Sequence, residues 1–171
     1  MKKKKTFISN FLDKESFKEL QNLITGEDFP WFQRKKMVST STNDMGYFTH
    51  SFYNNNQINS NHYYYQYIKP ILSQLDCKAV IQVRANLIPS AFYKEDSCAF
   101  HKDYEYESTT AILYLNTCDG GTEFQLTKKK IQFAFVEAEE NKIAIFDADT
   151  QHRGTKSYNS DFRYILNFNY F

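Results

Sequence analysis

The spacing of apolar residues divides the 171-residue chain into two regions. In the first region, residues 13–24 carry apolar side chains at helical intervals behind an aspartate, a favoured N-cap residue, and they predict a helix. A second apolar stripe over residues 64–75 predicts another helix, which Pro70 would kink or divide into two pieces. Between the two helices, MGYFTHSFY is expected to be an edge strand or an extended loop.

From residue 79 onward the apolar pattern has a period of two, which is typical of strands. The segments that follow this pattern are AVIQVRANLIP, TTAILYLN, GTEFQL, IQFAFV, KIAIF and RYILNFNYF. Loops that contain Gly, Asp, Asn or Lys separate them. Two helices followed by these strands predict a mainly β member of the α+β class, a barrel or sandwich with helices packed on one outer face.

The alternation along these strands leaves two arrangements open. If helices cover the apolar faces, the mixed faces look inward and form a polar ligand cavity. These mixed faces carry Arg84, Asn86, Tyr114, Arg163 and Asn167. In the alternative arrangement, the polar faces are solvated and the apolar faces form the core between two sheets, as is common in antiparallel sheets. Periodicity alone favours the second arrangement, because an alternating strand does not indicate which of its faces is wet.

Composition and charge restrict the class of protein. The length suits one domain over residues 1–171 that buries a core without disulfides. The 21 Lys and Arg residues nearly balance the 20 Asp and Glu residues, which argues against a dedicated nucleic-acid binder. No apolar run reaches the roughly twenty residues that a membrane helix needs. Three scattered cysteines without a CxxC pair indicate reduced thiols and predict a cytoplasmic protein.

The candidate chemistry begins at FHKDYE, where His101 and Asp103 lie two residues apart. On a strand they would share one face, so a single ion could bind both. His152 follows the predicted strand KIAIF. Two imidazoles and one carboxylate form the facial triad of non-haem Fe(II) oxygenases, which leaves positions open for an oxo acid and O₂. An HxD pair alone often arises by chance, so the signal depends on His152 and Arg163 following it in this order.

A dicarboxylate co-substrate would need a counter-charge for the carboxylate that lies far from the metal. Arg163, at the head of the last predicted strand, is the candidate, because a guanidinium can donate two parallel hydrogen bonds to a carboxylate. The hydroxyl of Tyr114 would add a donor, and Asn86 is a weaker candidate for the carboxylate nearer the metal. Arg84 has two open roles, contact with substrate at the cavity mouth or pairing with an acidic neighbour.

With these residues in place, the sequence resembles the Fe(II)/2-oxoglutarate-dependent dioxygenases. The segments HKD, QHRG and RYILNFNYF carry the HxD, H and R pattern of that superfamily. AILYLNTCDGGTEF and FISNFLDKESFKELQNLI resemble segments of the prolyl 4-hydroxylase-like branch, in its short stand-alone bacterial and phage members. The resemblance implies a double-stranded β-helix, a jelly-roll or cupin-like barrel. Residues 79–171 would form the barrel core with the site, and residues 1–78 a helical support region.

The resemblance also implies roles for individual residues. Those implied to hold Fe(II) are His101, Asp103 and His152. Arg163 would anchor 2-oxoglutarate and Tyr114 would assist it. O₂ would be the second co-substrate, and ascorbate is a candidate supporting reductant.

A further residue, Tyr93 or Asn86, would face the 2-oxoglutarate. The expected reaction hydroxylates a C–H bond of a peptide or protein side chain and releases succinate and CO₂. One alternative is the same chemistry on a small metabolite or a nucleobase. The other alternative, from a different class, is a cupin-like module that binds zinc or no metal and has no catalytic activity.

Overall fold

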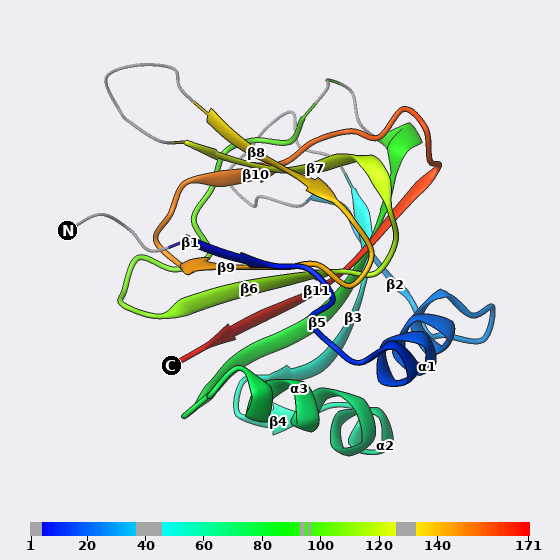
Figure 1. Ribbon diagram of the computed structural model, residues 1–171, viewed down its shortest axis with the longest axis vertical. Coiled ribbons are helices and arrows are strands. Elements are labelled where there is room, and N and C mark those ends of the chain that lie inside the picture. Colours follow the sequence, from blue (N-terminus) through cyan, green and yellow to red (C-terminus); the bar gives the residue numbers. More distant parts are fainter. Residues whose placement is uncertain (1–4, 37–45, 93–94, 96, 126–132) are drawn as a thin grey trace.

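Two antiparallel sheets face each other in the computed structural model of the chain, which describes residues 5–36, 46–92, 95, 97–125 and 133–171 (Figure 1). In chain order the elements are β1 (Lys5–Ile8), α1 (Lys14–Thr25), β2 (Phe32–Arg34), β3 (Tyr47–Asn54), β4 (Gln57–Ile58), α2 (Asn61–Tyr63), a π-helical turn (Tyr64–Ile68), α3 (Lys69–Gln74), β5 (Val80–Pro89), a 3₁₀ turn (Ser90–Phe92), β6 (Thr109–Tyr114), β7 (Cys118–Gln125), β8 (Phe133–Ala138), β9 (Ile143–Asp147), β10 (His152–Gly154) and β11 (Phe162–Tyr170).

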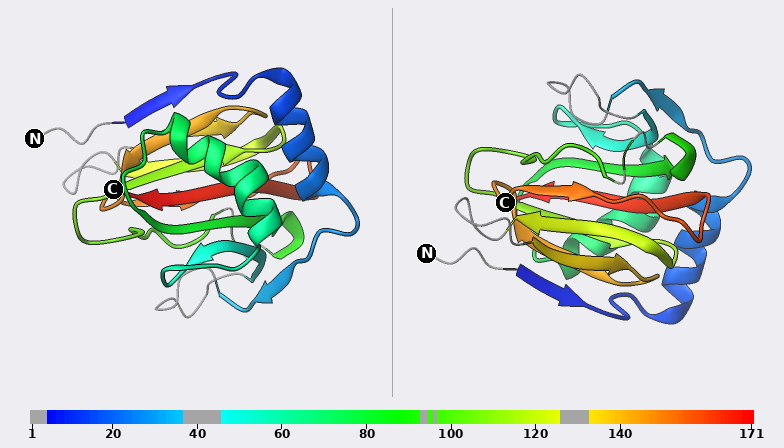
Figure 2. Two further views of the ribbon diagram at one scale, coloured as in Figure 1. Left: turned by 90° about the horizontal axis from the view of Figure 1, so that it is seen from below. Right: turned by 90° about the horizontal axis from the view of Figure 1, so that it is seen from above.

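The larger sheet has eight strands and the smaller sheet three. The larger sheet runs β1-β9-β6-β11-β5-β3-β2, with β4 paired to β3, and the smaller runs β10-β7-β8. The last strand, β11, lies between β5 and β6, so strands distant in the sequence become neighbours. The helices lie on one side of the larger sheet and the smaller sheet on the other (Figure 2). The mainly β, two-sheet prediction is therefore confirmed.

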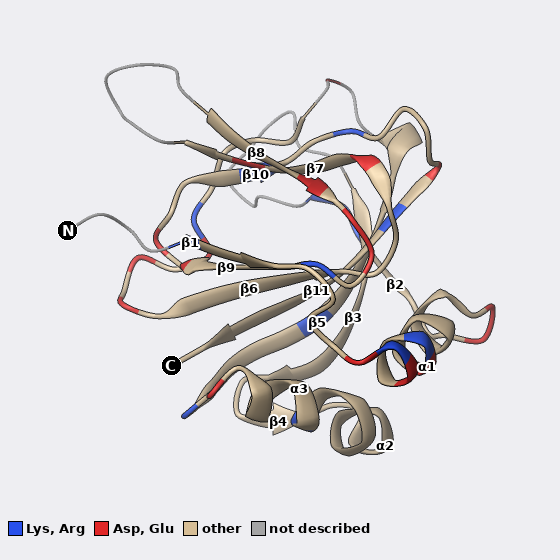
Figure 3. Cartoon of the chain, in the orientation of Figure 1, with Lys and Arg blue, Asp and Glu red and all other residues tan. Residues whose placement is uncertain are grey.

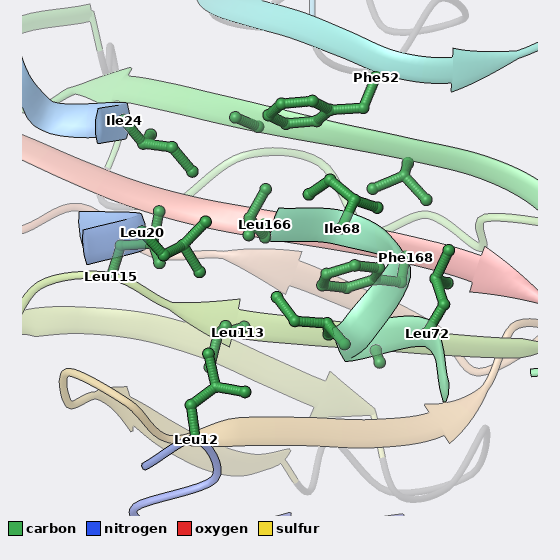
Figure 4. Packing of buried hydrophobic residues seen from close by; sticks show 14 of the residues in the cluster. Leu12, Leu20, Ile24, Phe52, Ile68, Leu72, Leu113, Leu115, Leu166 and Phe168 are labelled. Atoms are coloured by element: carbon green, nitrogen blue, oxygen red, sulfur yellow. The ribbon is translucent and has the colours of Figure 1, made fainter. Parts of the chain in front are cut away.

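The apolar faces of the larger sheet lie under the helices. Side chains from α1, the π-helical turn and α3 form one buried cluster with side chains from β5, β6 and β11. Figure 4 shows members of this cluster between the helices and the sheet: Leu20, Ile24, Ile68, Leu72, Leu113, Leu166 and Phe168. Burial of these side chains removes apolar surface from water and is the main stabilising contribution of this layer.

The opposite, mixed face of the larger sheet is enclosed by the smaller sheet. A second buried cluster lies between the sheets and includes Ile112, Tyr114, Phe124, Phe146 and Ile165. The polar residues on this face are also largely withdrawn from solvent: Asn86 is 6% exposed, Arg163 3% and Asn167 4%. The inward-facing arrangement of the mixed faces is therefore correct, and the alternative with solvated polar faces is wrong.

The predicted helices are present, and Pro70 has a visible effect. Helix α1 begins after Asp13, whose carboxylate accepts a hydrogen bond from the Ser16 backbone N–H at 3.0 Å. The second helix changes type before Pro70, because a π-helical turn over Tyr64–Ile68 separates α2 from α3. Proline has no backbone N–H to donate, and the regular helical hydrogen-bond pattern changes at the π-helical turn that precedes it. Within the described ranges, no helix has the length and apolar character needed to span a bilayer.

Two expectations for the first 78 residues are corrected by the structure. This region is more than helical support, because it contributes β1, β2, β3 and β4 to the larger sheet. Strand β3, which contains most of MGYFTHSFY, is not at an edge, because it pairs with β5 on one side and with β2 on the other. The short apolar and aromatic runs around these strands lack the long alternation that made the later strands recognisable.

Candidate metal centre

Tertiary pairing of two distant segments brings His101 and His152 together. The two residues form an isolated antiparallel bridge, in which each backbone N–H donates to the other residue's carbonyl oxygen, at 3.0 and 2.9 Å. Their ring centroids lie 4.5 Å apart. Asp103 joins them, because its Oδ1 lies 3.8 Å from Nε2 of each histidine. The predicted triad is thus one cluster, with all three donor atoms within 4.8 Å of one another.

Backbone carbonyls orient both imidazoles. His101 Nδ1 lies 3.2 Å from the Ala99 carbonyl oxygen, and His152 Nδ1 lies 3.0 Å from the Thr150 carbonyl oxygen. A carbonyl oxygen only accepts, so in each ring Nδ1 carries the hydrogen and Nε2 keeps its lone pair. Both lone pairs face Asp103, which is the orientation that metal-ligating histidines usually have.

The carboxylate of Asp103 is held through its other oxygen. Asp103 Oδ2 accepts hydrogen bonds from the Thr110 hydroxyl at 2.9 Å and from Asn169 Nδ2 at 2.8 Å. Asn167 Nδ2 lies further away, at 3.4 Å. Thr110 and Asn169 are directly paired across β6 and β11. The larger sheet therefore fixes Oδ2 and leaves Oδ1 directed at the two histidines.

The charges in the cluster set its protonation state. Burial and the neighbouring His152 lower the pKa of His101 to about 4. Burial opposes ionisation of Asp103, but the charges of His152, Arg84 and His101, together with the Asn169 hydrogen bond, lower its pKa to about 2. At neutral pH His101 is neutral and Asp103 is ionised, which is the state in which both can bind a metal ion.

The cluster fits a divalent metal ion. Imidazole nitrogen and carboxylate oxygen bind such ions at about 2.1 Å, so two donors of one ion lie at most about 4.2 Å apart. The separations of 3.8 Å from Asp103 Oδ1 to each histidine Nε2 are within this limit, and all three donor atoms lie within 4.8 Å of one another. Two histidines and one carboxylate are the donor set of non-haem iron sites that keep further positions open for other ligands.

A cavity of about 230 Å³ opens beside the cluster, between the two sheets. Its walls come from β3, β5, β6, β7, β10 and β11 and from the segment around His101. The lining residues are Tyr47, Arg84, Asn86, Ile88, His101, Lys102, Asp103, Ile112, Thr122, His152, Gly154, Arg163, Ile165 and Asn167. The mixed face of the larger sheet thus forms the wall of a polar cavity.

Arg163 lies at the end of the cavity away from the metal cluster. It is four residues before Asn167 on β11, a distance of about 13 Å along a strand. Its guanidinium donates a hydrogen bond to the Gly121 carbonyl oxygen. Gly121 lies at a bulge in β7, where an added Cβ would come within 2.1 Å of the Val136 carbonyl oxygen. Both Gly120 and Gly121 lie within β7.

Tyr114 is not among the residues that line the cavity, and its expected help in binding a co-substrate stays a prediction. Its ring is fully buried between the sheets, and its hydroxyl donates to Thr122 Oγ1 at 2.8 Å. Burial raises the pKa of Tyr114 to about 12, so the hydroxyl stays protonated. Thr122 lines the cavity in its place, and Tyr114 holds the Thr122 hydroxyl.

Asn86 does line the cavity, about midway between the metal cluster and Arg163. It pairs across the strands with Ile165, and the Thr49 hydroxyl lies 2.9 Å from its Oδ1. Tyr93, the other candidate for the residue that faces 2-oxoglutarate, lies outside the described residues.

Several cavity residues were missed by the reading of the sequence. Tyr47 is 6% exposed and lines the cavity from β3, a strand that the sequence suggested was an edge or a loop. Thr122 lies in the predicted strand GTEFQL, in which nothing marked it as a cavity residue. Asn169 and Thr110, which bind Asp103 and are not among the lining residues, occupy polar positions of two alternating strands, and that alternation was the signal that could have identified them.

Comparisons with solved structures identify the fold. An oxidoreductase of the 2OG-Fe(II) oxygenase family from Burkholderia pseudomallei matches with a TM-score of 0.69 and 9% identity, over 97% of this chain and 84% of that one. The epimerase SnoN from nogalamycin biosynthesis, solved with Fe³⁺, α-ketoglutarate and nogalamycin RO, matches with a TM-score of 0.66 and 13% identity, over 99% and 79%.

A prolyl hydroxylase from Trichoplax adhaerens, in complex with a hypoxia inducible factor peptide fragment, matches with a TM-score of 0.64 and 14% identity, over 97% of this chain and 83% of that one. At such low identities these likenesses establish a shared fold. No known family model matches the sequence, and no curated protein matches it.

Proposed function

We propose that this protein is an Fe(II)- and 2-oxoglutarate-dependent dioxygenase. In this proposal His101, Asp103 and His152 hold the iron, and Arg163 binds the carboxylate of 2-oxoglutarate that lies far from it. One observation carries the proposal: a two-histidine, one-carboxylate cluster and a buried guanidinium lie at opposite ends of a single cavity. A short dicarboxylate that chelates the metal at one end of the cavity would meet the positive charge of Arg163 at the other end.

The bound iron would supply the activation of O₂ that couples decarboxylation of 2-oxoglutarate to oxidation of a C–H bond. The chain's own residues bind and orient the reactants. The Gly121 carbonyl oxygen fixes the Arg163 guanidinium, which can then donate two parallel hydrogen bonds to a carboxylate. Thr122 and Tyr47 line the cavity beside it and can add hydroxyl donors.

The expected outcome is hydroxylation of a C–H bond, with release of succinate and CO₂. A peptide or protein side chain is the first substrate class to examine, because the Trichoplax protein that shares this fold holds a peptide fragment. The three cysteines, Cys77, Cys98 and Cys118, form no disulfide in the described structure, which is consistent with action in a reducing compartment such as the cytoplasm.

The decisive experiment combines binding and turnover. Anaerobic addition of Fe(II) and 2-oxoglutarate to the full chain should produce a weak visible charge-transfer band, and admission of air with ascorbate should release succinate. Arg163→Gln should weaken 2-oxoglutarate binding by about 10- to 100-fold, because a buried carboxylate loses its charged partner. The matched control is Arg34→Gln, the same change at an exposed residue of β2 that is not part of the cavity.

Two outcomes would contradict the proposal. One is the absence of both the band and succinate from wild-type protein that binds Fe(II). The other is equal 2-oxoglutarate affinity in the Arg163→Gln and Arg34→Gln proteins, because the far carboxylate would then not be held by Arg163.

A further inference from the structure

We propose that Arg84 is the anchor for a carboxylate of the primary substrate, so that the substrate is an acid. This inference deepens the function proposed above and rests on it. It concerns a second guanidinium in the cavity, one that neither the metal cluster nor the 2-oxoglutarate site uses.

Arg84 lies in the middle of β5, on the face that forms the cavity wall. It pairs across the strands with Asn167 of β11 and with Ser51 of β3, and its side chain is partly buried. It is the one charged residue of β5, as Arg163 is of β11 (Figure 3). The pairing puts Arg84 beside the metal end of the cavity, four residues along the sheet from Arg163's partner Ile88.

The guanidinium of Arg84 has no partner of its own within the described part of the chain. Its Nε is buried without a hydrogen bond, and it forms no ion pair there. Asp103 is near enough for the charge of Arg84 to affect the pKa of its carboxyl group, but the carboxylate oxygens of Asp103 already face the two histidines and the donors of the sheet. Among the described residues, Arg84 therefore forms no ion pair with an acidic neighbour, which was the alternative role expected for it.

The charge balance of the loaded cavity points to an anion. Among the described residues that line the cavity, Asp103 is the one acid, and Lys102 is paired with Glu105. A divalent ion together with Arg163 is balanced by Asp103 and the two carboxylates of 2-oxoglutarate. The positive charge of Arg84 is left over, and a partly buried charge without a counter-charge is unfavourable. One further carboxylate would neutralise it with two parallel hydrogen bonds.

Neighbouring groups indicate what the rest of the acid would look like. Asn167 Oδ1, across the strands from Arg84, is also buried without a hydrogen-bond partner in the described structure, so it can accept from an N–H of the ligand. Tyr104, which follows Asp103, continues into a row of rings with Tyr106 and Phe171, at centroid distances of 5.0 and 5.9 Å. A carboxylate, an adjacent N–H and an apolar body together describe an N-acyl amino acid or the C-terminal residue of a peptide.

The test compares acids with their amides on the full chain loaded anaerobically with Fe(II) and 2-oxoglutarate. N-acetyl-leucine and N-acetyl-phenylalanine, and the carboxamide of each, are titrated calorimetrically into wild type, Arg84→Gln, Arg84→Lys and the control Arg34→Gln. Wild type and the control should prefer each acid to its amide by about tenfold or more. Arg84→Gln should reduce this preference to within about threefold, and Arg84→Lys should retain part of it because it keeps the charge but loses the planar fork.

Three results would overturn the inference. The first is that wild type binds each amide as well as its acid. The second is that Arg84→Gln weakens 2-oxoglutarate binding as much as it weakens acid binding, which would assign Arg84 to the co-substrate. The third is that phenyl phosphate, and none of the acids, binds in an Arg84-dependent manner. Failure of the proposed oxygenase function would give a different result, because the charge-transfer band would be missing. Binding of the acids and amides could still be compared in that case, through the change in unfolding temperature that each ligand causes.

Discussion

The two faces of the larger sheet differ in what they bury and in what they do. On the outer face, Leu166 and Phe168 of β11 are fully buried among apolar side chains beneath the helices. On the inner face, the alternate residues Arg163, Asn167 and Asn169 of the same strand are almost as well buried, but among polar groups. Burial alone therefore does not distinguish stability from chemistry, whereas the kind of group that is buried does.

The difference follows from the cost of burying polar groups. A buried apolar side chain contributes free energy through its removal from water. A buried polar group must instead recover its lost hydrogen bonds to water. On the inner face Asn169 recovers them through Asp103 and Thr110, but Arg84 Nε and Asn167 Oδ1 do not. Arg84 and Asn167 both line the cavity, where a ligand could supply the missing hydrogen bonds.

The largest effect is expected when the metal cluster loses its acid. Asp103→Ala removes the carboxylate from the cluster, and we expect succinate release to fall by roughly a thousandfold or more, because the remaining histidines cannot hold the ion in place. Anaerobic Fe(II) titration and a succinate assay measure this. Turnover within tenfold of wild type would show that the inner face is not the reactive one.

The next largest effect is expected from Phe168, which lies on the outer face of β11 next to the inner-face residues Asn167 and Asn169. Phe168→Ala should lower the free energy of unfolding by about 3–5 kcal/mol, because it leaves a cavity in the apolar cluster. Urea denaturation measures this loss. At temperatures where the variant stays folded, its 2-oxoglutarate affinity should remain within about twofold of wild type. A loss of affinity with unchanged stability would reverse the assignment of the two faces.

Asn169, the residue after Phe168, provides the matched test on the inner face. Asn169→Ala removes the 2.8 Å hydrogen bond to Asp103 Oδ2. We expect about 10- to 100-fold weaker Fe(II) binding, because residues that orient a metal ligand commonly contribute this much. The Kd for Fe(II) is the measurement, with circular dichroism to verify folding. An unchanged Kd would mean that Thr110 alone holds the carboxylate.

The smallest effect is expected far from both faces, at the start of α1. Asp13→Ala should lower the unfolding temperature by about 2–4 °C at neutral pH, because the Ser16 N–H loses its cap. The hydrogen bonds from Ser16 lower the pKa of Asp13 below 3.8. Its contribution is therefore present above that pH and is lost as the pH falls through the lowered pKa. The difference in unfolding temperature between the two proteins should disappear in strong acid, and a difference that persists there would rule out the ionised cap.

Where apolar and polar residues alternated over a long strand, the sequence predicted which residues share a face of the larger sheet. The strands around Arg84, Tyr114 and Arg163 showed two distinct faces, and the residues on each face were identified correctly. Where the alternation was less clear, the signal was weaker. Tyr47 was missed because β3, although eight residues long, carries aromatic and polar residues without a clear period of two. Thr122 was missed although it lies in a predicted strand, because the sequence did not show which face of that strand the cavity would occupy.

By itself, the sequence determined the alternation, the helix cap at Asp13 and the order of His101, Asp103, His152 and Arg163 along the chain. These features are local, because they depend on residues that are close in sequence. The tertiary structure decided which face of each strand was enclosed, that His101 and His152 would pair, and that Tyr114 would stand behind Thr122. Those outcomes depend on which strands become neighbours, and β11 reaches its place between β5 and β6 only when the whole sheet assembles.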